Sequence, residues 1–576
     1  RSNWYGQGVQ PLWNISKHSP QYRGALLTKW LSTDAANYAS DYIQQTNYTY
    51  TTSLYTNPSS ELYPHYPFPQ EIIQNEIIND TTEDRATLRI LLQPGFHLKA
   101  TNTLQYHARI TEQDKIEYPG ANGYAGVFKR TLKSAATHNA LKGINTTNQY
   151  TYTDYHKPKK IKTTFPGGST TKTFTYLNNP SAVGHDYYIG RLEKYVEKKI
   201  LGKESFKTTT KLTYKNNLIK TQQKKGQGTE WAREDYTYDT FGNLLTKTLK
   251  TTGMTNRTAH FVYDASGRFL IKSSDIEGLT TTFTYDTNNG NQLSVKNPYG
   301  LTISYTYDTW GRMKGETNYL NQTTTYAYKV SNVDGDWRLE KTIRSPDGGI
   351  SVSYYNALGW LLKTKAIAFN EKEVFKVFEY DAIGRKIRES EPYFDRPKHW
   401  NQWAYDHYGR LQSQSSFTGK VVTSEYEGLQ TTVDDGDKSV TSIQDALGNV
   451  TQITDPGGTL QYVYHANGSL KETVYGDHVV STEIDGWGRK IKLSDPSAGV
   501  YTYNYNGFGQ ITTETTPLGK TTFKYDATGK LTEKSIEGEL TDLTLSYTYD
   551  SDSKLLQEIT GSDGIEDLSY NYVYTY

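Results

Sequence analysis

The chain has 576 residues, with 63 Lys and Arg against 62 Asp and Glu, and it contains no cysteine. These values exclude disulfide bonds and thiolate metal sites, and the balanced charge gives no overall attraction to nucleic acid or membrane. No apolar run is long enough for a transmembrane helix, and 50 Tyr against 17 Phe and 2 Met favour an all-β protein, because strands let a Tyr ring pack while its hydroxyl stays in water.

Residues 1–86 show no regular period. They contain Trp4, Trp13 and Trp30, a proline-rich run at 63–69 and an acidic stretch at 71–84. Proline cannot donate a hydrogen bond to a strand ladder, so we expect irregular structure here, serving as a plug for one end of the molecule or as a docking segment.

Residues 87–140 are expected to form a small β segment around the turn Pro94-Gly95-Phe96. A Pro-Gly turn between two strands is the simplest interpretation. The segment Thr87–Lys99 also resembles the L-x-PGF segment of secreted surface proteins of Bacteroidota. That resemblance implies export through the type IX pathway.

Residues 141–234 are predicted to be degenerate copies of the repeat described next. Within them, positions 157–225 carry 16 Lys or Arg and only 4 Asp or Glu. Many of the lysines alternate with Thr and Tyr, as in Lys211–Lys215, which indicates the solvated face of a strand. A polyanion-binding patch is the alternative.

Residues 235–576 contain a repeated motif, of which Tyr380-Asp-Ala-Ile-Gly-Arg385 is a good copy. Asp at the first and Gly at the fourth turn position favour a type I turn closed by a bulge, with Gly in the left-handed conformation. The preceding Tyr-x-Tyr places two rings on one strand face. The motif residues that we single out are Tyr238, Asp239, Gly242, Tyr263, Asp264, Gly267, Arg268, Tyr285, Asp286, Tyr307, Asp308, Gly311, Arg312, Tyr380, Asp381, Gly384, Arg385, Tyr405, Asp406, Gly409, Arg410, Tyr525, Asp526 and Gly529.

A second turn falls midway between copies, as at Asp275–Gly278, Asn297–Gly300, Asp455–Gly458 and Thr516–Gly519. Turns every 10 or 11 positions predict a long antiparallel meander with strands of about 6 or 7 residues. About 26 strands at about 4.8 Å each would close into one turn about 40 Å wide, too wide for side chains to fill. Such a sheet must either surround something or stay open and solvated on both faces.

These copies resemble the RHS/YD-repeat family, whose signature is Tyr-Asp-x-x-Gly-Arg before a short apolar strand. The resemblance is clear from about Asp235 to Tyr576. It implies a hollow shell that encloses a toxic C-terminal domain in bacterial polymorphic toxins and insecticidal toxin complexes, whereas a related barrel in the animal teneurins serves adhesion. Because the chain starts at Arg1 and ends within a strand pattern, we expect a fragment whose array is truncated at the C-terminus.

Candidate chemistry is sparse. Asp455-Pro456 matches part of the motif at which the family's toxins cleave themselves, but its place within the repeats indicates a turn. The 12 histidines show no metal-ligand spacing, and we expect no cofactor. Trp400, Trp403, Tyr405 and Tyr408 could stack on sugars, although cross-strand packing is the simpler interpretation.

The leading hypothesis is a non-catalytic secreted or cell-surface shell, with its own C-terminal effector segment as cargo and secretion components as further partners. The alternative is a surface scaffold that binds a glycan or protein. A hydrolytic enzyme is the third, least favoured hypothesis, because no catalytic constellation is visible.

Overall fold

The computed structural model of the chain is built from β-strands. It describes residues 10–15, 26–32, 44–55, 71–74, 77–78, 82–86, 89–92, 97–98, 106–110, 116–118, 121–123, 127–333, 336–367, 371–539, 541–564 and 568–574. Within these ranges the only helical element is one 3-10 turn, η1 (Gly184–Asp186). No helix of the described part is long and apolar enough to cross a membrane.

One antiparallel sheet of 41 strands contains most of the described residues. It begins with β1 (Gln10–Ile15), β2 (Leu26–Ser32) and β3 (Gln44–Tyr55). β3 pairs with β12 (Val127–Asn139), and each later strand then pairs with the next as far as β49 (Leu568–Val573). The expected all-β meander is confirmed.

The N-terminal region differs from the expectation of irregular structure, because three of its stretches are strands of the large sheet. Short parallel pairs follow, in which β4 (Glu71–Gln74) lies beside β7 (Arg89–Leu92), and β6 (Thr82–Ala86) beside β9 (Tyr106–Ile110). Trp4, the proline run 63–69 and the Pro94-Gly95-Phe96 turn lie outside the described residues. The domain boundary at residue 140 stays a prediction; β12 ends at Asn139 and forms a hairpin with β13 (Ile144–Tyr152).

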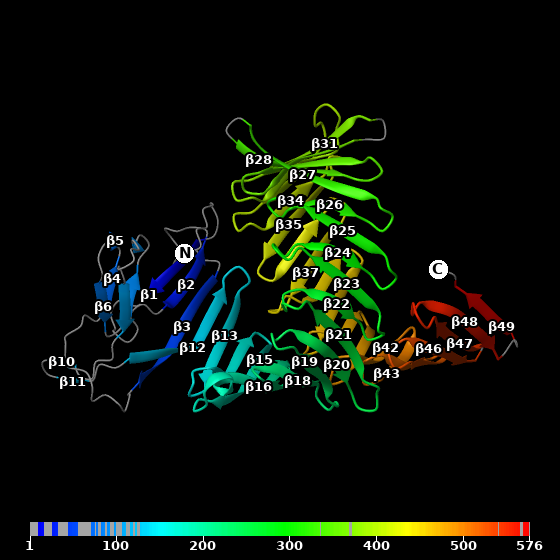
Figure 1. The fold of residues 1–576 in the computed structure, drawn as a ribbon, viewed down its shortest axis with the longest axis horizontal. Helices are drawn as coiled ribbons and strands as arrows, with labels where there is room; N and C mark the ends of the chain where they lie inside the picture. Colours follow the sequence, from blue (N-terminus) through cyan, green and yellow to red (C-terminus); the bar gives the residue numbers. More distant parts are fainter. Residues whose placement is uncertain are drawn as a thin grey trace.

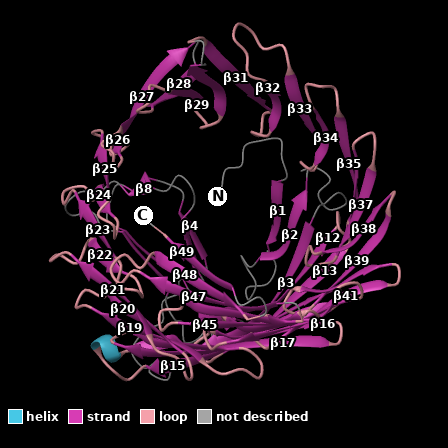
Figure 2. Cartoon of the chain, turned by 90° about the vertical axis from the view of Figure 1, so that its right-hand side faces the viewer, coloured by secondary structure: helices cyan, strands magenta, loops and turns pink. Residues whose placement is uncertain are grey.

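The sheet winds into a hollow ring. Figure 2 shows the strands from β19 (Ala232–Tyr238) to β41 (His478–Ile484) following one another clockwise around an open centre. Figure 1 shows the two ends of the ribbon leaving the ring on opposite sides, with β1 to β3 on the left and β46 (Leu531–Gly538) to β49 on the right. The sheet is therefore a helical ribbon that does not close by strand pairing, in keeping with the expected shell.

The described part from Ala232 to Val573 holds 31 strands, β19 to β49, rather than the expected 26. The difference arises because some hairpins lack the Tyr-Asp signature. One is formed by β27 (Thr323–Val333) and β28 (Asp336–Arg344), and another by β35 (Val421–Glu427) and β36 (Gln430–Asp434). Strand pairing continues through these hairpins without interruption, so the wall has no gap there.

Candidate functional site: the seam and inner face of the shell

The ribbon meets itself along a line that we call the seam. The turns on one edge follow the Tyr-Asp motif and are called repeat turns, and those on the other edge are called midpoint turns. At the seam, midpoint turns near residues 202, 227, 252 and 277 contact repeat turns near residues 465, 486, 507 and 527. The partners are separated by roughly 250 to 270 positions, which makes one winding of about 23 strands and a ring about 35 Å wide.

His465 provides the most buried polar contact of the seam. It follows β39 (Gly458–Tyr464) and is only 5% exposed. Its Nδ1 lies 2.9 Å from Oε1 of Glu204, and its Nε2 lies 2.9 Å from the carbonyl oxygen of Thr482. Because a carbonyl oxygen only accepts, hydrogen bonds on both sides of the ring require a proton on each nitrogen or on the Glu204 carboxyl.

Arg257 holds a second point of the seam, where β21 (Arg257–Tyr263) begins. Its Nε donates to the carbonyl oxygen of Ala527 at 3.1 Å, and its Nη2 donates to Oε1 of Gln510 at 2.9 Å. The guanidinium also lies 4.0 Å from the centre of the Phe508 ring. Burial lowers the pKa of Arg257, although Asp526 opposes this effect. One side chain thus connects two repeat turns of the later winding.

Backbone contact and an ion pair complete the seam. The N–H of Gln227 donates to the carbonyl oxygen of Gly486 at 3.2 Å. A Cβ on Gly226 would collide with the backbone of Gly486, and a Cβ on Gly486 would collide with that of Gln227. Farther along, Nζ of Lys530 lies 2.9 Å from Oε2 of Glu277. The two windings therefore touch closely enough to leave no room for side chains at residues 226 and 486.

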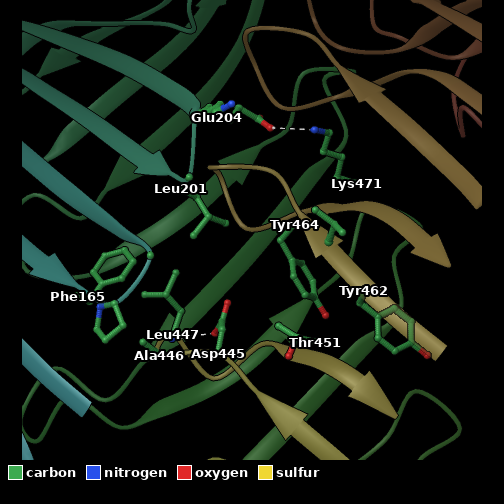
Figure 3. Close-up of a pocket in the computed structure, with 15 residues that line it drawn as sticks. Phe165, Leu201, Glu204, Asp445, Ala446, Leu447, Thr451, Tyr462, Tyr464 and Lys471 are labelled. Atoms are coloured by element: carbon green, nitrogen blue, oxygen red, sulfur yellow. Dashed lines mark hydrogen bonds and ion pairs between the residues drawn. The ribbon is translucent and has the colours of Figure 1, made fainter. Parts of the chain in front are cut away.

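A pocket of about 610 Å³ opens beside His465 at the same seam. Figure 3 shows Phe165, Leu201 and Leu447 around it, with Glu204 and Lys471 paired at its rim. These last two side chains are 3.9 Å apart. The pocket lies between two midpoint turns and one repeat turn, so it is a widening of the seam.

The register and the winding direction decide which sheet face looks into the hollow. Asp406 directly follows β33 (Trp400–Tyr405), and its N–H donates to the carbonyl oxygen of Arg410, on the side of the following strand. Because neighbouring residues of a strand direct their N–H and C=O groups to opposite sides, those of Tyr405 point to the preceding strand. When a strand of L-residues runs upward with a side chain toward the observer, that residue's N–H and C=O lie on the right. Strands that end in repeat turns run from right to left in Figure 1, and hence away from the viewer in Figure 2. The repeat tyrosines therefore face the hollow.

Five of the seven motif tyrosines also tie their repeat to the one before, through their hydroxyl groups. The hydroxyl of Tyr405 donates to the carbonyl oxygen of Lys386 at 2.8 Å, and that of Tyr380 to Leu361 at 2.9 Å. Tyr238, Tyr307 and Tyr525 make the same kind of bond, to Ile219, Gln292 and Ile511. Burial raises the pKa of Tyr238, Tyr307, Tyr380 and Tyr525.

The repeat aspartate organises the turn and holds the arginine. In one copy, Oδ1 of Asp406 accepts the N–H groups of Tyr408 and Arg410, while Oδ2 accepts Nε of Arg410 at 2.7 Å. Burial raises the Asp406 pKa, but these hydrogen bonds and the Arg410 charge outweigh it, so the net pKa is lowered. The guanidinium lies 4.4 Å from the ring centre of Tyr426, on the next hairpin. The same arrangement holds for Asp381 with Arg385 and for Asp308 with Arg312.

The turn glycines have positive φ, as this turn requires: 90° at Gly242, 69° at Gly267, 75° at Gly311, 88° at Gly384, 84° at Gly409 and 105° at Gly529. The copies at Asp264 and Asp286 differ, because the N–H of each aspartate bonds five positions ahead rather than four. The backbone N–H of Arg268 still donates to Asp264, but this extra residue carries the guanidinium away, so that it donates to the carbonyl oxygen of Thr287. The rings of Tyr285 and Phe269 stack there at 5.0 Å.

The other candidate residues from the sequence are engaged in contacts within the sheet. Asp455 pairs with Gly458 across a two-residue turn, and its Oδ1 accepts the Gly457 N–H at 2.8 Å. Trp400 is covered by Arg388 at 4.1 Å and Trp403 by Lys386 at 4.1 Å, so a cation already occupies one side of each ring. The described residues contain no group of three or more His, Asp or Glu side chains placed to hold a metal ion.

The seam residues were not predicted from the sequence. Glu204, Arg257 and His465 stand in no shared motif, and their partners lie hundreds of positions away. Gly486 lies in a Gly-Trp-Gly run that forms one of the repeat turns. No local pattern distinguishes a turn at the seam from a turn facing solvent.

Comparison with known families agrees with this architecture. Residues 427–566 match the sequence profile of the teneurin YD-shell, and residues 263–302 match that of the RHS repeat. These two matches support membership of the RHS/YD-repeat family. A comparison with curated protein sequences gave no significant match.

Solved structures share the fold. The chain is similar to TcdB2-TccC3 without its hypervariable C-terminal region, at 11% identity and a TM-score of 0.58, over 96% of this chain and 35% of that one. It is also similar to a chain of the Photorhabdus luminescens Tc holotoxin pore, at 11% identity and a TM-score of 0.56, with the same coverage. This chain thus spans about a third of the length of these structures.

Proposed function

We propose that this RHS/YD-repeat protein is a secreted or surface shell that encloses a polypeptide cargo and shields it until delivery. The seam is the observation that carries the proposal. A sheet whose windings are joined by His465, Arg257 and Lys530 forms a continuous wall around a hollow. An open solvated ribbon would have no need of buried contacts between its edges.

The inner face is suited to a loosely held cargo. Tyrosines along it present ring surface, but their hydroxyls are largely occupied by backbone carbonyl groups. Such a surface offers apolar contact without strong polar anchors. The similar protein TcdB2-TccC3 has a hypervariable C-terminal region, which supports a C-terminal segment as the cargo. The role proposed is structural rather than catalytic.

Adjacent serines on opposite faces of one strand provide the test. Ser273 pairs with Phe261, on the tyrosine face, and Ser274 pairs with His260, on the other face. Since the chain has no cysteine, Ser273→Cys and Ser274→Cys each introduce a single thiol. We expect a bulky polymer-linked maleimide to modify the thiol at 274 much faster, while a small maleimide should modify both at similar rates.

A cargo assay completes the test. The chain is extended at its C-terminus by a small soluble domain, and the rate at which protease removes that domain is compared with the same domain alone and in a Gly486→Ala background. Protection that is lost when the seam is disturbed supports encapsulation. Equal cleavage in all three, or equal labelling of both thiols by the bulky reagent, contradicts it and leaves the surface-scaffold alternative.

A further inference from the structure

The strand register distributes the basic side chains of residues 157–225 over the two faces of the sheet. These residues form β14 (Pro158–Phe165), β15 (Gly168–Asn179), β16 (Tyr188–Leu201), β17 (Glu204–Lys215) and β18 (Leu218–Lys225). Directly paired residues share a face. The pairings place eight lysines together on one face, which we call the lysine face: Lys160, Lys162, Lys194, Lys198, Lys207, Lys211, Lys215 and Lys225.

Like charges stand directly opposite one another on the lysine face. Lys194 pairs with Lys211, and Lys198 pairs with Lys207. Such pairs destabilise a sheet, and no carboxylate of these strands relieves them. Glu197 and Glu204 belong to the other face, and Glu193 lies at a register shift. On that other face, by contrast, Lys172 and Glu197 form an ion pair at 3.7 Å.

The lysine face is accessible and is the outer face of the shell. It is opposite to the face of Phe174 and Tyr195, which pair with each other, and Lys160, Lys198, Lys207, Lys211 and Lys215 are exposed. None of these five forms an ion pair among the described residues; Lys211 lies 5.0 Å from the Trp231 ring centre. Threonines and a serine alternate with the lysines, so hydroxyl groups stand beside the ammonium groups at this surface: Thr164, Thr171, Thr173, Thr175, Ser205 and Thr213.

We propose that the lysine face binds an acidic polysaccharide. Unneutralised lysines supply charge for carboxylate or sulfate groups, and the hydroxyls between them can bond sugar hydroxyls. Nucleic acid fits less well, because the only arginine of these strands, Arg191, is occupied by Tyr188 and Asn217, and the rings of Phe174, Tyr195 and Phe206 belong to the other face. A membrane fits less well, because the large apolar side chains of the face, such as Val196 and Ile200, are only partly exposed.

The test measures binding of polygalacturonate to the full chain as salt is raised. We expect binding that weakens with salt, and a loss of about threefold to tenfold in affinity for the double variant Lys198→Gln/Lys207→Gln, as two exposed charge contacts would give. The control Lys199→Gln/Lys224→Gln removes the same charge from the other face of these strands and should bind like the parent.

The free protein gives a second readout. The Lys198→Gln/Lys207→Gln variant should unfold at the same or higher temperature than the parent, because it removes a like-charge pair, so weaker binding cannot be ascribed to misfolding. Equal losses in both double variants would overturn the proposal. So would tighter binding to phosphatidylglycerol vesicles or to an oligonucleotide than to polygalacturonate. The test does not depend on encapsulation, since an outer face can bind whether or not the shell holds cargo.

Discussion

The imidazole Nδ1 of His465 and Oε1 of Glu204 lie 2.9 Å apart although 261 positions separate the two residues. Each belongs to a hairpin whose own hydrogen bonds would form without the other. Their contact therefore depends on how the whole ribbon winds, whereas strand pairing depends only on local folding. Substituting one of the two residues should disturb the winding without disturbing the strand pairing.

The change His465→Ala should weaken the seam and leave the hairpins intact. The substitution removes two buried hydrogen bonds and leaves Glu204 with the Ala466 N–H, at 3.3 Å, and the more distant Lys471. We expect a loss of about 2–3 kcal/mol, seen in urea unfolding, with faster hydrogen exchange at residues 202–205 and 465–468. The exposed His478→Ala is the control. Equal effects of both changes would contradict a role in closure.

The change Gly486→Ala should open the windings by steric contact alone. Gly486 does not have positive φ, so Ala adds no backbone strain, but its Cβ would meet the backbone of Gln227. The control Gly457→Ala adds a Cβ that meets only Asp455, at 3.1 Å. We expect the first variant to lose about 1–3 kcal/mol and to show a larger radius in small-angle scattering. An unchanged radius would indicate that the seam does not hold the ring.

The change Arg410→Met should uncouple neighbouring repeats. It removes the ion pair with Asp406 and the cation above the Tyr426 ring. The expected cost is about 1–2 kcal/mol, with increased exchange at β35. The exposed Arg396 forms no ion pair in the described structure, so Arg396→Met should change stability by less than about 0.5 kcal/mol.

High pH should destabilise the shell. Burial raises the pKa of Tyr195 to about 12, with help from Glu197, and raises the pKa of Tyr380, Tyr525 and Tyr549 above the ordinary value of 10.0. A raised folded-state pKa gives stability that is fully present below pH 10 and is lost as pH rises through the folded value. Unfolding free energy should therefore fall between pH 10 and about 12. Phenolate absorbance that titrates wholly at pH 10 in the folded protein would rule this out.

The sequence predicted the local structure because the determinants are local. The spacing of Tyr380, Asp381 and Gly384 specifies a turn, a bulge and a strand face within six positions. The role of Arg410 required the structure, since its partner Tyr426 belongs to the next hairpin. The seam could not be predicted at all: Glu204 and His465 meet only because of the curvature of some 23 intervening strands, and that curvature is the sum of many small twists. The lysine face could be predicted only in part. The alternation of lysines with Thr and Tyr is visible in the sequence, but the pairing of Lys198 with Lys207 follows only from the strand register.

The contacts between specific turns along the seam restrict how this array can change in length. Inserting or deleting a hairpin between Glu204 and His465 would leave every strand paired, yet it would bring Glu204 opposite a different repeat turn and displace the Gly226–Gly486 contact. Loop variation is tolerated at any turn away from the seam, whereas a change in repeat number must be accompanied by new residues along the whole line of contact. Relatives of different repeat number should accordingly differ most in sequence at the turns where successive windings meet.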